Sequence, residues 1–112
     1  MKVRELHIDA YGCKCNLNDA ELLLSTLVRA SKKVKATVVR KIIHKYKPYG
    51  LTVITLLAET HASIFTYPEF DYAGIEIFLC NESMDPYKFW STVKKMLKPK
   101  KVKIKEIKRT IK

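Results

Sequence analysis

Three cysteines, Cys13, Cys15 and Cys80, are side chains of this sequence that could do chemistry. The Cys13-Lys14-Cys15 segment could supply two thiolates to a metal ion, but no second pair of cysteines or histidines stands at the spacing of a zinc site. An odd number of cysteines also argues against a disulfide framework. We therefore expect free thiols and no metal. Cys80 ends an apolar run and could simply be a small buried residue.

The other reactive side chains of interest lie between positions 44 and 80. Four segments contain them: His44-Lys45-Tyr46-Lys47-Pro48-Tyr49-Gly50, Ala58-Glu59-Thr60-His61, Tyr67-Pro68-Glu69-Phe70-Asp71-Tyr72-Ala73 and Phe78-Leu79-Cys80. Taken singly, these residues have ordinary structural interpretations, for example Tyr46 as a cross-strand packing partner or Glu69 as an acidic turn residue. Their order and spacing together carry the functional information.

In that order, and with Asp85-Pro86 and the helix expected after it, these segments resemble the small bacterial and archaeal S-adenosylmethionine decarboxylases, over nearly the whole chain. The resemblance implies an enzyme of polyamine (spermidine) biosynthesis that cleaves itself at a Glu-Ser-His tripeptide. In this family the serine hydroxyl attacks the preceding carbonyl, and the ester that results then eliminates. The new chain begins with a pyruvoyl group, a ketone that accepts the electrons left by departing CO₂.

The resemblance also implies catalytic roles for residues of this chain. It places the cleavage between Glu59 and Thr60, with His61 completing the tripeptide, and it makes Cys80 the proton donor. Elimination from Thr60 would give a 2-oxobutanoyl group in place of pyruvoyl.

For the substrate, the resemblance implies a second set of residues. Tyr46 stands where the family has an aromatic that stacks on adenine, and His44 stands where it has a histidine. Glu69 can accept hydrogen bonds from ribose hydroxyls, and Thr52 takes the place of a helper serine.

Two departures from the family pattern affect self-processing. Thr60 replaces a serine, and its methyl group crowds the attack although a hydroxyl remains. Phe65 stands where the family usually has another histidine that assists processing. Loss of a general base typically costs ~10² to 10⁴ in rate.

Three functional hypotheses follow. In the first, the chain cleaves itself and decarboxylates S-adenosylmethionine, or arginine or ornithine as some relatives in the family do. In the second, it stays uncleaved and acts as a binding or regulatory partner. In the third, the basic stretch after position 98 binds nucleic acid, but the absence of interleaved aromatics disfavours this.

The elements that must position these residues follow from hydrophobic periodicity and turn residues. The pattern predicts strands at 3–11, 34–46, 51–58, 61–66, 72–80 and 101–109, and helices at 18–33 and 85–97. Asn18 is a candidate cap for the first helix, with Glu21 three residues later. Asp85 followed by Pro86 is a strong start for the second.

Six strands and two helices in this order predict an α+β fold, a two-layer α/β sandwich whose mainly antiparallel sheet carries both helices on one face. The 112 residues fit a single domain, 1–112. The other sheet face must then contact solvent, ligand or a partner. The resemblance adds that protomers pair as homodimers with pockets at the interface, and a heterodimer with a competent paralogue is the alternative.

The net charge is +11, and eight of the 22 basic residues lie between positions 98 and 112. We expect an edge strand there whose lysines discourage pairing with other chains. No apolar run approaches the ~20 residues of a membrane span, and the N-terminus does not resemble a secretory signal. A cytoplasmic location is the default expectation. The abundance of lysine and the lack of glutamine are typical of thermophile proteins.

Overall fold

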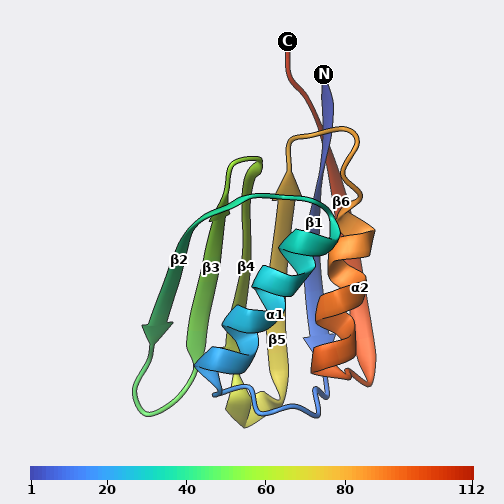
Figure 1. The fold of residues 1–112 in the computed structure, drawn as a ribbon. Coiled ribbons are helices and arrows are strands. Elements are labelled where there is room, and N and C mark those ends of the chain that lie inside the picture. The colour runs from blue at the N-terminus through green and yellow to red at the C-terminus, as the bar shows by residue number, and fades with distance from the viewer.

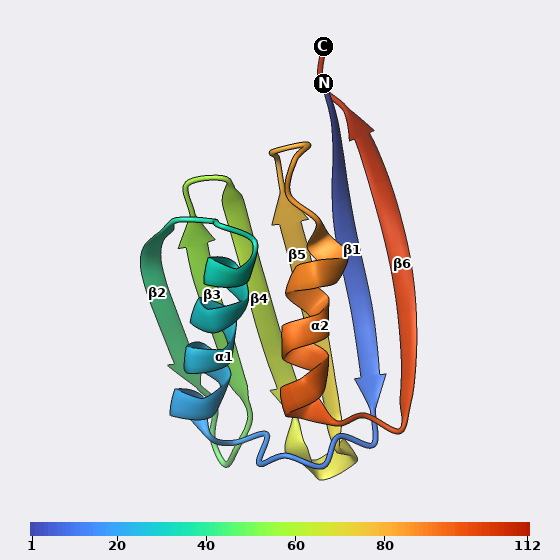
Figure 2. The ribbon, with the colours of Figure 1, turned by 45° about the vertical axis from the view of Figure 1, so that its right-hand side comes forward.

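The computed structural model describes all 112 residues and contains one six-stranded antiparallel sheet with two α-helices packed on one face (Figure 1, Figure 2). The elements are β1 (Lys2–Tyr11), α1 (Ala20–Lys33), β2 (Val38–Lys45), β3 (Leu51–Leu57), β4 (Thr60–Tyr67), the 3₁₀ turn η1 (Pro68–Phe70), β5 (Tyr72–Leu79), α2 (Pro86–Leu97) and β6 (Lys101–Thr110). The strands lie in the order β2-β3-β4-β5-β1-β6, and every neighbouring pair is antiparallel. The predicted two-layer α+β sandwich is confirmed.

The core lies between the helices and the inner face of the sheet. Alternation along β1 and β5 turns one set of apolar side chains toward the helices, and Leu6, Ile75 and Ile77 are fully buried there. The helices contribute residues such as Leu27 from α1 and Phe89 from α2. This burial on one side only leaves the opposite face, called the open face below, without any covering element (Figure 2).

Both helices begin at an aspartate. The Asp85 carboxylate accepts a hydrogen bond from the N–H of Tyr87, as the sequence predicts. The first helix is capped by Asp19, which accepts from the N–H of Leu22, so the expectation that Asn18 caps it is wrong. The Asn18 side chain instead accepts from the N–H of Gly50 and ties the start of α1 to the β2–β3 loop. Neither helix is long and apolar enough to cross a membrane.

The strand predicted from position 34 begins only at Val38. Val34 still belongs to the end of α1, because its N–H donates to the carbonyl of Ala30, and Lys35 then adopts a left-handed φ of 62°. Residues 34–37 therefore turn the chain from helix to strand. The β-branched composition of this segment predicted a strand, but the reversal of direction after α1 requires a loop there.

The two edge strands are strongly basic. β2 contains Arg40, Lys41 and Lys45 and no acid, while β6 contains five basic residues and one acid, Glu106. The expected edge position of β6 is confirmed by its single neighbour, β1. Two copies that paired edge to edge would bring like charges together, which is a common protection against sheet extension.

The capping assignment can be tested by substitution. Asp19→Ala should lower the free energy of unfolding by about 1 kcal/mol, because the N–H of Leu22 loses its acceptor. Asp19→Asn retains a side-chain oxygen and should be close to the unmodified protein. Urea denaturation measures both, and equal stability of the Ala and Asn variants would contradict the assignment.

Candidate active site

The turn between β3 and β4 places Thr60 at the first position of β4, at the top of the sheet in Figure 1. Thr60 has a φ of 123°, a conformation that residues with a branched Cβ rarely adopt. Such strain costs on the order of 1–3 kcal/mol and persists only where neighbouring structure holds it. The Thr60 hydroxyl donates to the carbonyl of Phe78 on β5. The sequence gives no sign of this backbone strain.

The peptide bond before Thr60 is held from two sides. The backbone N–H of Cys80 donates to the carbonyl oxygen of Glu59 at 2.9 Å. On the other side, the Glu59 carboxylate accepts from the N–H of Thr37 at 3.0 Å, and the N–H of Ala58 donates to the Thr37 carbonyl at 2.9 Å. The loop before β2 and the end of β5 thus fix the Glu59–Thr60 bond, and the Cys80 N–H is placed to stabilise negative charge on the Glu59 carbonyl oxygen.

Two of the predicted catalytic side chains lie next to this bond. Thr60 pairs with Leu79, so Cys80 follows directly, and its free thiol is partly buried. His61 lies on the open face, where its ring meets the ring of Phe78 edge-on at 5.8 Å. The His61 imidazole forms no hydrogen bond with the Thr60 hydroxyl. The structure therefore brings Glu59, Thr60 and Cys80 together and leaves His61 beside them without a direct link.

The predicted substrate-binding residues gather at the opposite end of the open face. The Tyr46 hydroxyl lies 3.1 Å from the hydroxyl of Thr52, and the rings of His44 and Tyr46 meet at 4.5 Å. A hollow of about 670 Å³ opens here; its lining includes Tyr46, Thr52, Phe65, Tyr67, Glu69 and Glu76. Aromatic faces beside carboxylates suit a ligand that joins a flat base, which stacks on the rings, to a sugar whose hydroxyl groups donate to the carboxylates. His44 does not line this hollow but packs on Tyr46 from β2.

The two groups of predicted residues are far apart in one chain. Thr60 is the first residue of β4 and Tyr67 the last, and a strand rises roughly 3.3 Å per residue, so the Glu59–Thr60 bond and the hollow lie on the order of 20 Å apart. Position 65 shares the open face with His61 but lies roughly 13 Å further along β4. A histidine at position 65 could therefore not reach Thr60 of its own chain.

Phe65 is packed on a glycine that sequence reasoning missed. Its ring lies so close to Gly74 on β5 that a Cβ at position 74 would meet the Phe65 Cζ at 2.0 Å. Around it stand three tyrosine rings, with centroid distances of 6.4 Å from Phe65 to Tyr67, 6.2 Å from Phe65 to Tyr72 and 5.5 Å from Tyr72 to Tyr11. A glycine inside an alternating strand marks a close approach, and that signal could have revealed the contact.

Two carboxylates on β1 stabilise the same face. Asp9 accepts a hydrogen bond from the hydroxyl of Tyr72, and burial together with this carboxylate raises the pKa of Tyr72, which keeps the phenol protonated. Glu5 lies within 3.0 Å of both His7 and Arg109. Burial opposes the ionisation of Glu5, but the hydrogen bonds from these two partners outweigh it and lower the pKa of the carboxyl group.

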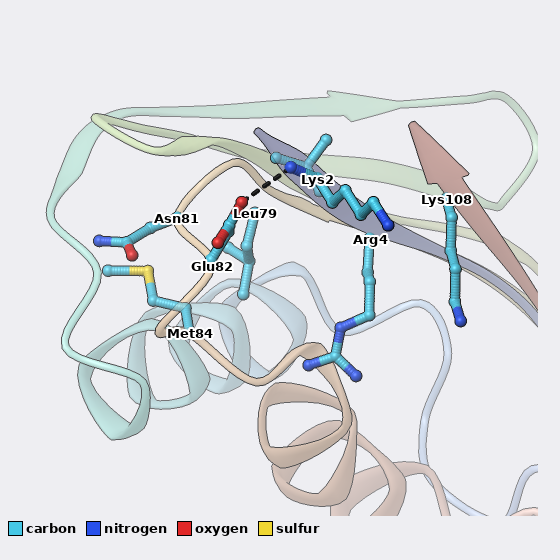
Figure 3. Close-up of a pocket in the computed structure, with 8 residues that line it drawn as sticks. Lys2, Arg4, Leu79, Asn81, Glu82, Met84 and Lys108 are labelled. Carbon is cyan, nitrogen blue, oxygen red and sulfur yellow. Dashed lines mark hydrogen bonds between the residues drawn. The ribbon is translucent and has the colours of Figure 1, made fainter. Parts of the chain in front are cut away.

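Another hollow, of about 330 Å³, lies near the start of β1 (Figure 3). It is on the helix side of the sheet, at the end of the sheet where Thr60 lies. Lys2, Arg4 and Lys108 line it beside Glu82, whose carboxylate accepts from the N–H of Lys2. It contains no thiol, imidazole or strained hydroxyl, so it lacks the groups that self-cleavage and proton donation would require. No group of three or more His, Cys, Asp or Glu side chains is placed to hold a metal ion.

Comparisons with known proteins identify the family of this chain and its fold. A family model described as S-adenosylmethionine decarboxylase matches residues 4–110. The S-adenosylmethionine decarboxylase proenzyme of Thermotoga petrophila is 36% identical over 104 residues, which cover 92% of this chain and 80% of that protein. The proenzyme of Methanococcus maripaludis is 35% identical over 109 residues, covering 96% and 89% respectively. The crystal structure of the adenosylmethionine decarboxylase from Aquifex aeolicus VF5 matches with a TM-score of 0.82 and 25% identity, over 97% of this chain and 91% of the other.

The fold is thus that of a small α+β decarboxylase, with a strained Glu-Thr turn where the resemblance places the cleavage. The chain belongs to the S-adenosylmethionine decarboxylase family. The family predicted from the sequence is confirmed.

The contact between Phe65 and Gly74 predicts a non-additive effect. Gly74→Ala should lower the free energy of unfolding by about 1–3 kcal/mol, because the new methyl group displaces the Phe65 ring. In a Phe65→Ala background the same substitution should cost much less. Urea denaturation of the unmodified protein, the two single variants and the double variant tests this. An equal cost of Gly74→Ala in both backgrounds would show that the Phe65 ring does not require a glycine at position 74.

The Glu5 cluster predicts part of the acid sensitivity. Because folding lowers the pKa of Glu5, the stability from its ionised form is present above its ordinary pKa of 4.5 and is lost as the pH falls through the folded value. Glu5→Gln should therefore make the free energy of unfolding depend less steeply on pH below pH 4.5. Glu21→Gln, an exposed acid of α1, is the control and should change the slope less. Thermal unfolding across the acid range measures both, and identical slopes would contradict the assignment.

Proposed function

We propose that this chain is a self-processing S-adenosylmethionine decarboxylase of polyamine synthesis, which forms its carbonyl prosthetic group at Thr60. The observation that carries the proposal is the geometry of the Glu59–Thr60 bond: a strained threonine whose preceding carbonyl oxygen accepts from the Cys80 N–H. The relatives named as proenzymes of this decarboxylase support it. The cytoplasm is the compartment we propose for this reaction.

The cleavage can be written with this chain's own atoms. Thr60 Oγ1 bonds to the Glu59 carbonyl carbon and the amide C–N bond breaks, which leaves an ester and a free amino group on Thr60. A base then removes the Thr60 Cα proton, the Cβ–Oγ1 bond breaks, and the Glu59 carboxylate leaves with both oxygens. Water replaces the nitrogen, which departs as ammonia. Strain at Thr60 favours the first step, because the attack relieves the unfavourable φ.

The residues around this bond fit the group that would form. The Cys80 N–H stabilises the oxyanion of the attack, and the Cys80 thiol, one residue beyond the partner of Thr60, is placed to donate a proton. When present, the 2-oxobutanoyl group supplies the electron sink that decarboxylation requires. His61, which the structure leaves without a hydrogen bond to Thr60, is the nearest imidazole along the chain and a candidate for the base.

A homodimer through the open faces explains why the two predicted groups lie apart. The basic edges disfavour edge-to-edge pairing, while the open face presents the aromatic cluster of Phe65, Tyr67 and Tyr72. A two-fold axis that lies between facing sheets and crosses the strands brings the top of one sheet to the bottom of the other. The hollow of one protomer then meets Thr60 of its partner.

S-adenosylmethionine suits the hollow better than arginine or ornithine. Tyr46, Phe65 and Tyr67 offer ring faces for stacking a base, and Glu69 offers a carboxylate for ribose hydroxyls. Arginine or ornithine would use the carboxylates but leave most of the aromatic surface without a partner. Competition binding between S-adenosylmethionine and arginine discriminates these substrates.

The second candidate function, an uncleaved binding or regulatory partner, is favoured by one observation. Phe65, in place of the family's histidine, is firmly packed on Gly74 and offers no base to a facing Thr60. In this reading a paralogue that supplies the histidine completes the site in a heterodimer, and this chain contributes only the hollow.

Mass spectrometry separates the two functions. We expect the purified protein to convert slowly from a single chain of 13.0 kDa into fragments 1–59 and 60–112. Thr60→Ser with Phe65→His should accelerate the conversion by ~10² to 10⁴, because a general base is restored. Thr60→Ala is the matched control and should stay intact.

The opposite result is equally informative. If the unmodified protein and the double variant both stay intact while S-adenosylmethionine still binds, the chain is a binding partner and the decarboxylase proposal is wrong. Sedimentation that finds only monomer at micromolar concentration would count against the shared site.

A further inference from the structure

A second charged hollow lies directly beside the proposed cleavage bond, on the helix side of the sheet. It has a volume of about 680 Å³ and opens between the end of α1, the start of α2 and the β5–α2 loop. Three lysines, Lys33, Lys35 and Lys88, line it together with Glu59 and Asp85. The residue that precedes the strained Thr60 therefore lines an open surface hollow that is rich in exposed lysines.

Two of these lysines occupy positions that the local structure disfavours. Lys35 has a left-handed φ of 62°, a conformation that Gly or Asn adopts at lower cost. Lys88 lies in the first turn of α2, which contains no acid, so its charge faces the positive pole of the helix. Lys33 suits the negative pole at the end of α1 and needs no other explanation. Residues that contradict local preference tend to mark functional sites.

The charges in this hollow are not balanced. None of the three lysines takes part in any of the four ion pairs of the structure. The two acids are already engaged: the Asp85 carboxylate accepts from Tyr87 and lies 3.7 Å from Arg4, and the Glu59 carboxylate accepts from Thr37. The hollow can therefore accept one more negative charge without displacing an existing contact.

We propose that this lysine hollow is the receptor for the α-carboxylate that self-cleavage leaves on Glu59. This inference rests on the proposed function, because self-cleavage is what would create the carboxylate. The lysines that would receive it are already in place in the uncut chain. Elimination converts the neutral Glu59 carbonyl into a carboxylate, so that one residue then carries two negative charges. Lys35 and Lys88 compensate this charge, stabilise the departing carboxylate during elimination, and hold the cut end in place afterwards.

The first test follows the rate of cleavage by mass spectrometry, in whichever of the unmodified protein and the Thr60→Ser, Phe65→His variant is cut. Lys35→Gln and Lys88→Gln should each slow the appearance of fragments roughly two- to fivefold, as expected for ion pairs of exposed side chains. Added salt should reduce this difference. Lys101→Gln, at the other end of the molecule, is the matched control and should have no effect. Unchanged rates in both lysine variants would overturn the proposal.

The second test creates the same carboxylate without self-cleavage. The chain termini are adjacent, because the Met1 amino group donates to the Ile111 carbonyl at 3.0 Å (Figure 1). A circular permutant that joins residues 112 and 1 by a short linker and opens between 59 and 60 therefore ends in the Glu59 α-carboxylate. Lys35→Gln and Lys88→Gln should each lower the folding equilibrium constant of this permutant. The decrease should be roughly two- to fivefold larger than the decrease that the same substitution causes in the unopened chain. A permutant with one glycine added after Glu59 moves the carboxylate by one residue and should lose part of this difference.

The outcomes separate the two proposals. If no chain cuts itself but the permutant shows the lysine dependence, the proposed function fails and the receptor stands. Equal effects of the lysine substitutions in the permutant and the unopened chain overturn the receptor. If the opened chain does not fold, the cleavage rates decide. A chain that neither cuts nor folds when opened at this bond has no cut end to hold, and the receptor proposal falls.

Discussion

Antiparallel pairing of β4 with β3 on one side and β5 on the other is the constraint on which the rest of the structure depends. It brings Leu57 opposite Thr60 and Thr60 opposite Leu79, so the backbone at position 60 has no freedom to relax. The unfavourable φ of Thr60 is then maintained by the stability of the whole sheet. The strain at the proposed cleavage bond is therefore a property of the sheet register more than of any single side chain.

The same pairing decides how far functional residues can act within one chain. Positions on one face of β4 repeat every two residues along the strand, so residues that share a face can still lie many ångströms apart. The sequence places His61 and position 65 on the same face, but it cannot say that His61 lies beside the Glu59–Thr60 bond and position 65 beside the hollow near Tyr46. In the proposed homodimer the second protomer would supply the missing surface, and the open face is the one uncovered face of the sheet.

Much of the fold could be predicted from the sequence because local signals agree with the final structure. Alternation gave β1 and β5 their inner faces, and Asp85-Pro86 marked the start of α2. Prediction failed where two neighbouring residues compete for one role, as with Asn18 and Asp19, since the choice depends on which side chain the β2–β3 loop needs. It also failed for residues 34–37, where β propensity is overruled by the need to leave α1 and brace the Glu59 turn. The candidate site residues were assigned through family resemblance. The Phe65–Gly74 contact depends on cross-strand register, which the glycine inside β5 signals as a close approach but does not specify.

The division of the aromatic residues between the two faces of the sheet makes the protein a natural optical reporter. The single tryptophan, Trp90, is buried on α2 in the helix layer, whereas Tyr11, Tyr67 and Tyr72 cluster on the open face. Tryptophan emission therefore follows the packing of the helices on the sheet. Tyrosine absorbance follows mainly the uncovered side, because Tyr87 on α2 is the only one of the six tyrosines that lies in a helix. Loosening of the core and occupation of the open face can thus be observed separately in one unlabelled sample.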